Sequence, residues 1–138
     1  MITFARVALA MQTAALLASP AIAQSQQRFD LICAVGSKAD SPQRELRYSV
    51  DLDSSQWCGP RCKAPETIAA VAPDQLTLKN MGPIGNDPLD RNDRYTITIK
   101  RADGSYESVF VMRTAGLFEV DRGTCRVAEF TAFPKTLF

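Results

Sequence analysis

The feature that most constrains the fold is the alternation of apolar and polar residues in short segments. An extended strand turns successive side chains to opposite faces, so alternation at a period of two predicts a strand with one buried face. Between residues 44 and 52, polar or charged positions alternate with four apolar ones, Leu46, Tyr48, Val50 and Leu52. Beyond residue 23 we find no segment with the 3.6-residue apolar period of an amphipathic helix.

The clearest single element is a β-hairpin. The run Tyr95–Lys100 alternates apolar and polar residues, and a second β-rich run, Ser105–Arg113, follows it. Asp103-Gly104 lies between the two runs, and both residue types tolerate the positive φ angles of tight hairpin turns. We therefore expect an antiparallel pair of strands that reverses at Asp103-Gly104.

Turn signals separate several further strands. Pro73-Asp74 divides two of them, and Asp121-Arg122-Gly123 divides another two. Short strands at spacings of about 8–12 residues are typical of antiparallel sandwiches and small barrels. We predict an all-β fold, a small antiparallel barrel or sandwich with meander connections. Its other strands are expected at Phe29–Val35, Thr67–Ala72, Gln75–Lys79, Leu117–Val120 and Thr124–Phe130, with irregular segments at Asp53–Pro65 and Asn80–Asn92.

The first 23 residues have the pattern of a secretory signal helix. Arg6 gives a positive start, Val7–Leu17 is mostly apolar, and Ala21-Ile22-Ala23 supplies the small residues that signal peptidase requires. We expect a cleaved signal peptide, residues 1–23, and one β domain, residues 24–138. The apolar run is shorter than the roughly 20 residues that a membrane span needs. The expected product is a periplasmic or secreted monomer with no membrane span.

Four cysteines remain after the expected cleavage: Cys33, Cys58, Cys62 and Cys125. An even number of cysteines in an exported chain predicts two disulfides, for which three pairings are possible. We favour Cys58–Cys62, because Gly59-Pro60-Arg61 can turn the chain back on itself. The second pair, Cys33–Cys125, would then join the first and last strands.

The segment from Trp57 to Cys62 resembles the Trp-Cys-Gly-Pro-Cys site of thioredoxins with one residue inserted. A redox-active thiolate is usually stabilised at a helix N-terminus, whereas Pro65 and a strand-like run follow here. A zinc site of four cysteines would need two closely spaced pairs, and the chain has one. A structural disulfide is therefore favoured, and redox activity of Cys58 and Cys62 is kept as an alternative.

Charge and composition exclude several classes of function. Of the 16 basic residues only Arg6 lies within residues 1–23, and all 15 acidic residues follow it, so the expected domain is formally neutral. Nucleic acids and anionic membranes are captured by positive charge, and neutrality argues against both. The chain contains no histidine, which excludes Ser-His-Asp triads, Cys-His dyads and His-ligated zinc.

The carboxylates give no catalytic or metal-binding pattern. Asp51 and Asp53 share one strand face, whereas glycosidases hold two carboxylates across a sugar-sized cleft. Asp87, Asp90 and Asp93 recur at intervals of three but match no EF-hand spacing. We therefore predict no catalytic residue, no metal site and no cofactor.

The chain contains five spaced features: Phe29-x-Leu31-x-Cys33, Asp51-Leu52-Asp53, Trp57-Cys58 with Cys62, Ile99-x-Arg101-x-x-Gly104, and Gly123-Thr124-Cys125. Together they resemble a group of small uncharacterised bacterial exported proteins. The resemblance implies an exported all-β domain with paired cysteines, and it implies no activity. A looser likeness is to the periplasmic C-type lysozyme inhibitors, which are small β-barrels with cysteines near both ends. Their inhibitory segments have no counterpart in this chain, so no inhibitory residue is carried over.

These observations favour a non-enzymatic binding or interaction module of the bacterial cell envelope. Its partner is expected to be an unknown protein or a small apolar ligand. Trp57 is a candidate contact if its ring is exposed, although a tryptophan beside a disulfide usually packs into the core. Arg61, between two cysteines, is the other candidate contact. A thiol-disulfide redox protein using Cys58 and Cys62, and a barrel that encloses a small ligand, are the alternatives.

Overall fold

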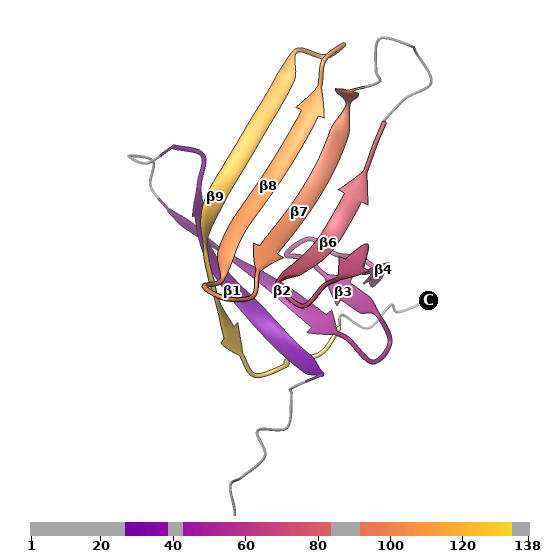
Figure 1. The fold of residues 1–138 in the computed structure, drawn as a ribbon, viewed down its shortest axis with the longest axis vertical. Helices are drawn as coiled ribbons and strands as arrows, with labels where there is room; N and C mark the ends of the chain where they lie inside the picture. The colour runs from indigo at the N-terminus through magenta and orange to yellow at the C-terminus, as the bar shows by residue number, and fades with distance from the viewer. Residues whose placement is uncertain (1–26, 39–42, 84–91, 134–138) are drawn as a thin grey trace, which may run out of the picture.

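A single curled antiparallel sheet forms the fold. The computed structural model describes residues 27–38, 43–83 and 92–133, so the expected signal helix lies outside the described residues. Within these ranges nine strands form one sheet in the order β4-β3-β2-β1-β9-β8-β7-β6-β5 (Figure 1). The strands are β1 (Arg28–Gly36), β2 (Arg44–Asp51), β3 (Gln56–Cys58), β4 (Glu66–Thr67), β5 (Ala70–Val71), β6 (Gln75–Met81), β7 (Arg94–Lys100), β8 (Ser105–Met112) and β9 (Leu117–Ala128).

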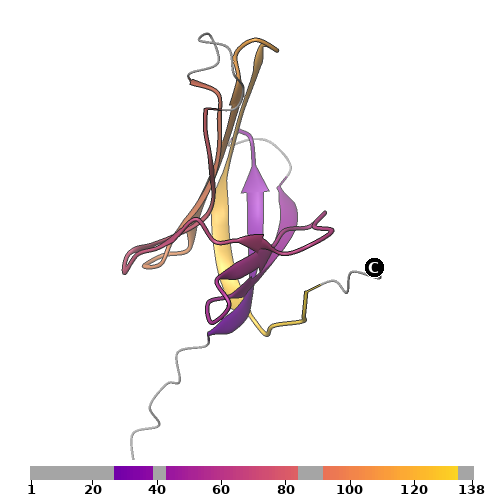
Figure 2. The same cartoon turned by 90° about the vertical axis from the view of Figure 1, so that its right-hand side faces the viewer.

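The sheet curls into a half-barrel, which confirms the all-β prediction and decides for a barrel over a sandwich. The connections are those of a meander, since each strand pairs with the next along the chain except at β4 and β5. Strand β9 returns to pair with β1, so the first and last strands lie together in the middle of the sheet. Figure 2 shows β6 and β7 curving to one side of β9, and β2 and β3 curving to the other.

A bent segment, residues 66–71, connects the two edges of the sheet. Its first half is β4, which pairs with β3, and its second half is β5, which pairs with β6. At the bend the Ile68 N–H donates to the Ser55 carbonyl at 2.9 Å, and the Ala69 N–H donates to the Leu78 carbonyl at 3.3 Å. The strand predicted at Thr67–Ala72 is therefore divided into two, because its backbone N–H and C=O groups form hydrogen bonds with two different edges of the sheet.

Strand β9 corrects one prediction, since it runs without the turn expected at Asp121-Arg122-Gly123. Asp121 and Arg122 form ion pairs with Arg44 and Glu107 instead of reversing the chain. Gly123 lies opposite β1, where a Cβ atom would come within 1.9 Å of the Ala34 carbonyl oxygen. Residues typical of a turn thus serve the close pairing of β1 with β9.

The predicted hairpin is confirmed by β7 and β8, whose turn contains Gly104 with a φ of 71°. The Asp103 carboxylate accepts the Ser105 N–H at 2.9 Å inside this turn. A Cβ atom at Gly104 would lie 2.2 Å from the Cys125 carbonyl oxygen, and the Cys125 N–H donates to the Gly104 carbonyl at 2.8 Å. Glycine is therefore required both for the backbone angle and for the approach to β9.

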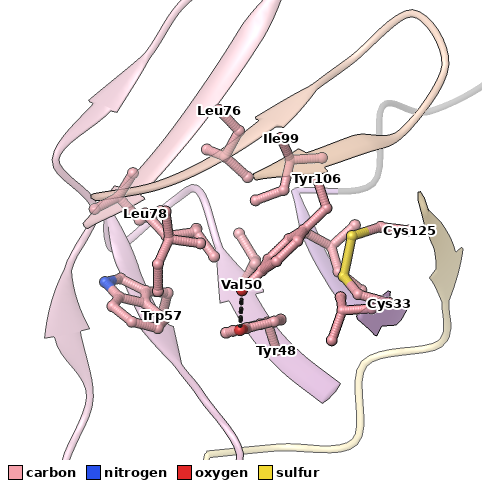
Figure 3. Packing of buried hydrophobic residues seen from close by; sticks show 13 residues of the cluster. Cys33, Tyr48, Val50, Trp57, Leu76, Leu78, Ile99, Tyr106 and Cys125 are labelled. Atoms are coloured by element: carbon pink, nitrogen blue, oxygen red, sulfur yellow. Dashed lines mark hydrogen bonds between the residues drawn. A yellow bond between two sulfur atoms is a disulfide. The ribbon is translucent and has the colours of Figure 1, made fainter. Parts of the chain in front are cut away.

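The core fills the concave face of the sheet (Figure 3). Both predicted disulfides are present: Cys33–Cys125 joins directly paired positions of β1 and β9, and Cys58–Cys62 closes a short loop after β3. The buried cluster consists of Leu31, Cys33, Val35, Tyr48, Val50, Trp57, Ile68, Leu76, Leu78, Ile97, Ile99, Tyr106 and Cys125.

The convex face of β1 and β2 is more buried than the alternating pattern indicated. Ser49 and Asp51, expected to face solvent, are 7% and 5% exposed, and Asp30 is fully buried. Thr131 donates a hydrogen bond to the Asp30 carboxylate at 2.7 Å, and Arg47 forms an ion pair with the same carboxylate at 3.1 Å. The segment after β9 therefore lies across the outside of β1.

Among the described residues there is no helix long and apolar enough to cross a membrane.

A candidate binding cleft beside the Cys58–Cys62 loop

A cleft with a volume of about 480 Å³ opens on the concave side of the half-barrel, beside the Cys58–Cys62 loop. Strands β2, β3 and β7 supply an apolar and aromatic floor, and the loop at Gly59–Cys62 forms one wall. Charged side chains from β2, the loop and β4 contribute the remaining surface. The floor comprises Leu46, Tyr48, Trp57, Tyr95 and Ile97, and the charged residues are Arg44, Arg61 and Glu66.

Local sequence explains the shape of the loop. Strand β3 ends at Cys58, Gly59 and Pro60 begin a turn, and the Cys62 N–H donates to the Gly59 carbonyl at 3.1 Å. The Cys58–Cys62 disulfide then closes the turn. A Cβ atom at Gly59 would lie 3.4 Å from both the Trp57 and the Tyr48 rings, so the loop backbone packs directly on the floor of the cleft.

The two residues predicted as partner contacts, Trp57 and Arg61, both line this cleft but differ in exposure. Trp57 is 4% exposed, its indole N–H donates to the Thr67 carbonyl at 3.3 Å, and its ring centroid lies 6.1 Å from that of Tyr48. Trp57 is therefore a core residue that borders the cleft. Arg61 is exposed and lies on the loop between the disulfide-bonded cysteines.

Three tyrosines lie on or below the floor of the cleft. The hydroxyl groups of Tyr48 and Tyr106 are hydrogen-bonded at 2.7 Å in the buried interior. Burial raises the pKa of Tyr48 and of Tyr106, and the nearby Tyr106 raises that of Tyr48 further. Burial also raises the pKa of Tyr95. All three phenols are thus neutral at physiological pH and serve as hydrogen-bonding and packing groups rather than as bases.

The charges around the cleft are mostly paired. Arg44 forms an ion pair with Asp121 on β9, and Glu66 forms one with Lys79 on β6. Arg61 makes no ion pair with any residue that the structure describes. It is therefore the charged side chain of the cleft best placed to meet an acidic group on a partner.

The environment of the Cys58–Cys62 disulfide, in the wall of the cleft, differs from that of a redox-active cysteine pair. Cys58 is 4% exposed, whereas Cys62 is half-buried. The chain after Cys62 continues into β4 rather than into a helix, so the loop lacks the helix N-terminus that commonly stabilises a reactive thiolate. This geometry is typical of a disulfide that fixes the shape of a loop.

Sequence reasoning missed Arg44, Glu66 and Tyr95 as residues of the cleft. Arg44 could have been predicted from the sequence, because it precedes Leu46 and Tyr48 at intervals of two residues and so lies on the same face of the strand. Glu66 and Tyr95 are brought to the cleft by the curl of the sheet, which no local pattern encodes. In the described part of the chain no group of three or more potential metal ligands gathers, and Asp87 and Asp90 lie outside it.

Comparison of this chain with protein-family models, curated proteins and solved structures found no match.

Proposed function

We propose that this protein is an exported, non-enzymatic binding module of the bacterial cell envelope that engages a protein partner through the cleft. The observation that carries the proposal is the position of Arg61. An exposed arginine with no ion pair among the described residues lies beside an aromatic floor, on a loop closed by a disulfide. Arginine and aromatic residues are the types that contribute most to binding energy at protein interfaces.

The disulfide-closed loop supports binding by reducing the entropy lost on association. A free loop must be ordered when a partner binds, at a cost that grows with the number of side chains immobilised. Here Gly59 is packed on the rings of Tyr48 and Trp57, and the Cys58–Cys62 bond fixes both ends of the turn. The loop is thus ordered before any partner arrives.

Export to the periplasm or the medium is part of the proposal. The two disulfides are consistent with an oxidising compartment, where such bonds form and persist. The expected signal peptide, residues 1–23, supports the same location from the sequence.

Site-specific photo-crosslinking in the periplasm tests the proposal. A photoreactive residue placed at position 60, which is exposed and lines the cleft while leaving Arg61 in place, should capture one discrete protein partner, identified by mass spectrometry. The same residue at position 126 is the control, because Arg126 is also an exposed arginine but lies on β9 away from the cleft. Arg61→Glu should weaken capture by the probe at position 60, whereas Arg126→Glu should not. Equal crosslinking at positions 60 and 126, or none at either, would contradict the proposal.

A further inference from the structure

A second concave site, an apolar cup formed at the start of β1 and the turn between β7 and β8, is not used by the proposed function. Its volume is about 440 Å³, within the range of small-molecule sites, and the mouths of β-barrels are a common location for such sites. Five strands or strand ends contribute apolar side chains to it. These are Phe29, Leu31, Leu52, Leu76, Ile99 and Val127.

The cup has a buried floor and an open rim. Leu31, Leu76 and Ile99 are each about 5% exposed, whereas Val127 is 60% exposed. The cup adjoins the cleft, because Leu31 of the cup is paired with Tyr48 of the cleft, but the two sites share no lining residue. Apolar surface left open to water in a concave site is stabilised when an apolar ligand covers it.

The charged residues that line the cup are both cations, Lys100 and Arg101. Both are exposed, and neither forms an ion pair within the described ranges. The Arg101 guanidinium donates to the Ala72 carbonyl at 3.2 Å, which holds that side chain near the rim. Asp103, in the same turn, does not line the cup, and hydrogen bonds with Ser105 together with the nearby Lys100 lower its pKa. The charged side chains that line the rim itself are positive and complement a negative charge.

We propose that the cup binds a free fatty acid, with the hydrocarbon chain against the apolar floor and the carboxylate facing Lys100 and Arg101. The Cys33–Cys125 disulfide supports the site, because Cys125 itself lines the cup and the bond fixes β1 to β9. Leu31 on β1 and Val127 on β9 are directly paired, so this bond also fixes their separation. The proposal is independent of the cleft and of its protein partner.

A chain-length series measured by isothermal titration calorimetry tests the apolar part of the site. Hexanoate, octanoate and decanoate should bind with affinity rising about two- to fourfold per added methylene, the range expected for partial to full burial of each group. Nonyltrimethylammonium, with the same nine-carbon alkyl chain as decanoate and the opposite charge, should bind at least fivefold more weakly. Affinity that does not depend on chain length, or stronger binding of the cation, would overturn the proposal.

Matched variants locate the site. Val127→Glu should weaken decanoate at least tenfold, because it brings a carboxylate to the rim, and its exposed position should leave the fold intact. Leu117→Glu, at an exposed apolar position that does not line the cup, should leave the affinity unchanged. Lys100→Gln should weaken decanoate about two- to fivefold. Arg126→Gln removes a charge next to Val127 on the opposite face of β9 and should have no effect.

Two further measurements test whether a second copy of the chain or a lipid surface, rather than a fatty acid, occupies the cup. In analytical sedimentation, the wild type and Val127→Glu should both be monomers. If the wild type is a dimer and Val127→Glu dissociates it, the cup is instead occupied by a second copy of the chain. Flotation with phosphatidylglycerol vesicles should leave the protein unbound. Vesicle binding that Val127→Glu abolishes would assign the cup to a lipid surface and overturn the fatty-acid proposal.

Discussion

The hydroxyl groups of Tyr48 and Tyr106 meet at 2.7 Å across the interior of the half-barrel. Tyr48 belongs to β2 and Tyr106 to β8, which are separated in the sheet by β1 and β9. The hydrogen bond therefore spans the curl and joins its two sides. Because both rings are about 4% exposed, each hydroxyl depends on protein partners for its hydrogen bonds.

Replacing both tyrosines of this pair should destabilise the protein by less than the sum of the two single replacements. Tyr48→Phe leaves the Tyr106 hydroxyl without its partner, at a cost of about 1–3 kcal/mol in the free energy of unfolding. In the double variant Tyr48→Phe/Tyr106→Phe no orphaned hydroxyl remains, so the loss should be smaller than the sum of the single losses. Urea unfolding of the four proteins measures this coupling. Strict additivity would mean that the two hydroxyls do not depend on each other.

The two disulfides should contribute unequally to stability. In the chain-entropy account, a bond spanning 92 residues, Cys33–Cys125, contributes about 4–5 kcal/mol, and one spanning four residues, Cys58–Cys62, much less. Paired Cys→Ser substitutions at each bond, compared by thermal unfolding, should show a far larger fall in Tm for the first. Similar falls in Tm for the two variants would contradict the ranking.

Two glycines with positive φ provide a matched pair in the hairpin turns. Gly104 and Gly116 have φ angles of 71° and 64°, so alanine at either position meets a left-handed backbone costing about 1–2 kcal/mol. At Gly104 the new Cβ atom would also contact the Cys125 carbonyl, whereas nothing lies within 4 Å at Gly116. Gly104→Ala should therefore lower Tm considerably more than Gly116→Ala. Equal effects would show that the backbone angle alone determines the cost.

Asp51 should make the stability sensitive to acid. Burial alone would raise the pKa of Asp51, but hydrogen bonds from Ser54 and Asp53 and the Arg28 guanidinium at 2.8 Å hold it below its usual value. The stabilisation is therefore fully present above about pH 4, the unfolded pKa, and is lost as pH falls through the lower folded pKa.

The matching experiment compares Asp51→Asn with the wild type across pH. The variant should be less stable near pH 7, and the difference in Tm should shrink as the pH falls well below 4. Asp53, an exposed aspartate two residues further along the chain, gives the control Asp53→Asn, which should follow the wild type throughout. A Tm difference for Asp51→Asn that stays constant with pH would show that the ionised carboxylate is not the stabilising form.

The insulin-reduction assay tests the redox alternative. With Cys58 buried and no helix following Cys62, the reduced protein should precipitate insulin no faster than the uncatalysed reaction. Cys58→Ser should give the same rate. Catalysis that this substitution abolishes would place redox activity ahead of the binding-module proposal.

Local patterns were sufficient for the strands that alternate and for the turn that needs glycine. Leu46, Tyr48 and Val50 lie on the concave face as their spacing predicted, and Gly104 has the positive φ expected of it. The disulfide pairing also followed from position, since two cysteines lay in the first and last strands and two flanked a turn. For the strands, the turn and the Cys58–Cys62 bond a few neighbouring residues carry the information, and Cys33–Cys125 is then the pair that remains.

Features set by distant contacts were missed. Gly123 reads locally as part of a turn, but its role depends on the approach of Ala34 from the other end of the chain. Asp30 is buried because Thr131, which is 101 residues away, reaches its carboxylate. The cleft brings Arg44, Glu66 and Tyr95 together only once the sheet has curled. No window of neighbouring residues contains these relationships.

The bond between Cys33 and Cys125 also bears on the fate of a cleaved chain. All the residues from 34 to 124 lie within the covalent ring that this bond closes, including the turn at Arg113–Gly116 between β8 and β9. A protease that cuts once anywhere in that ring produces two pieces that remain a single molecule. Because β1 and β9 lie side by side at the middle of the sheet, the nicked pieces also stay in register, and the cut protein can keep its shape in surroundings rich in proteases.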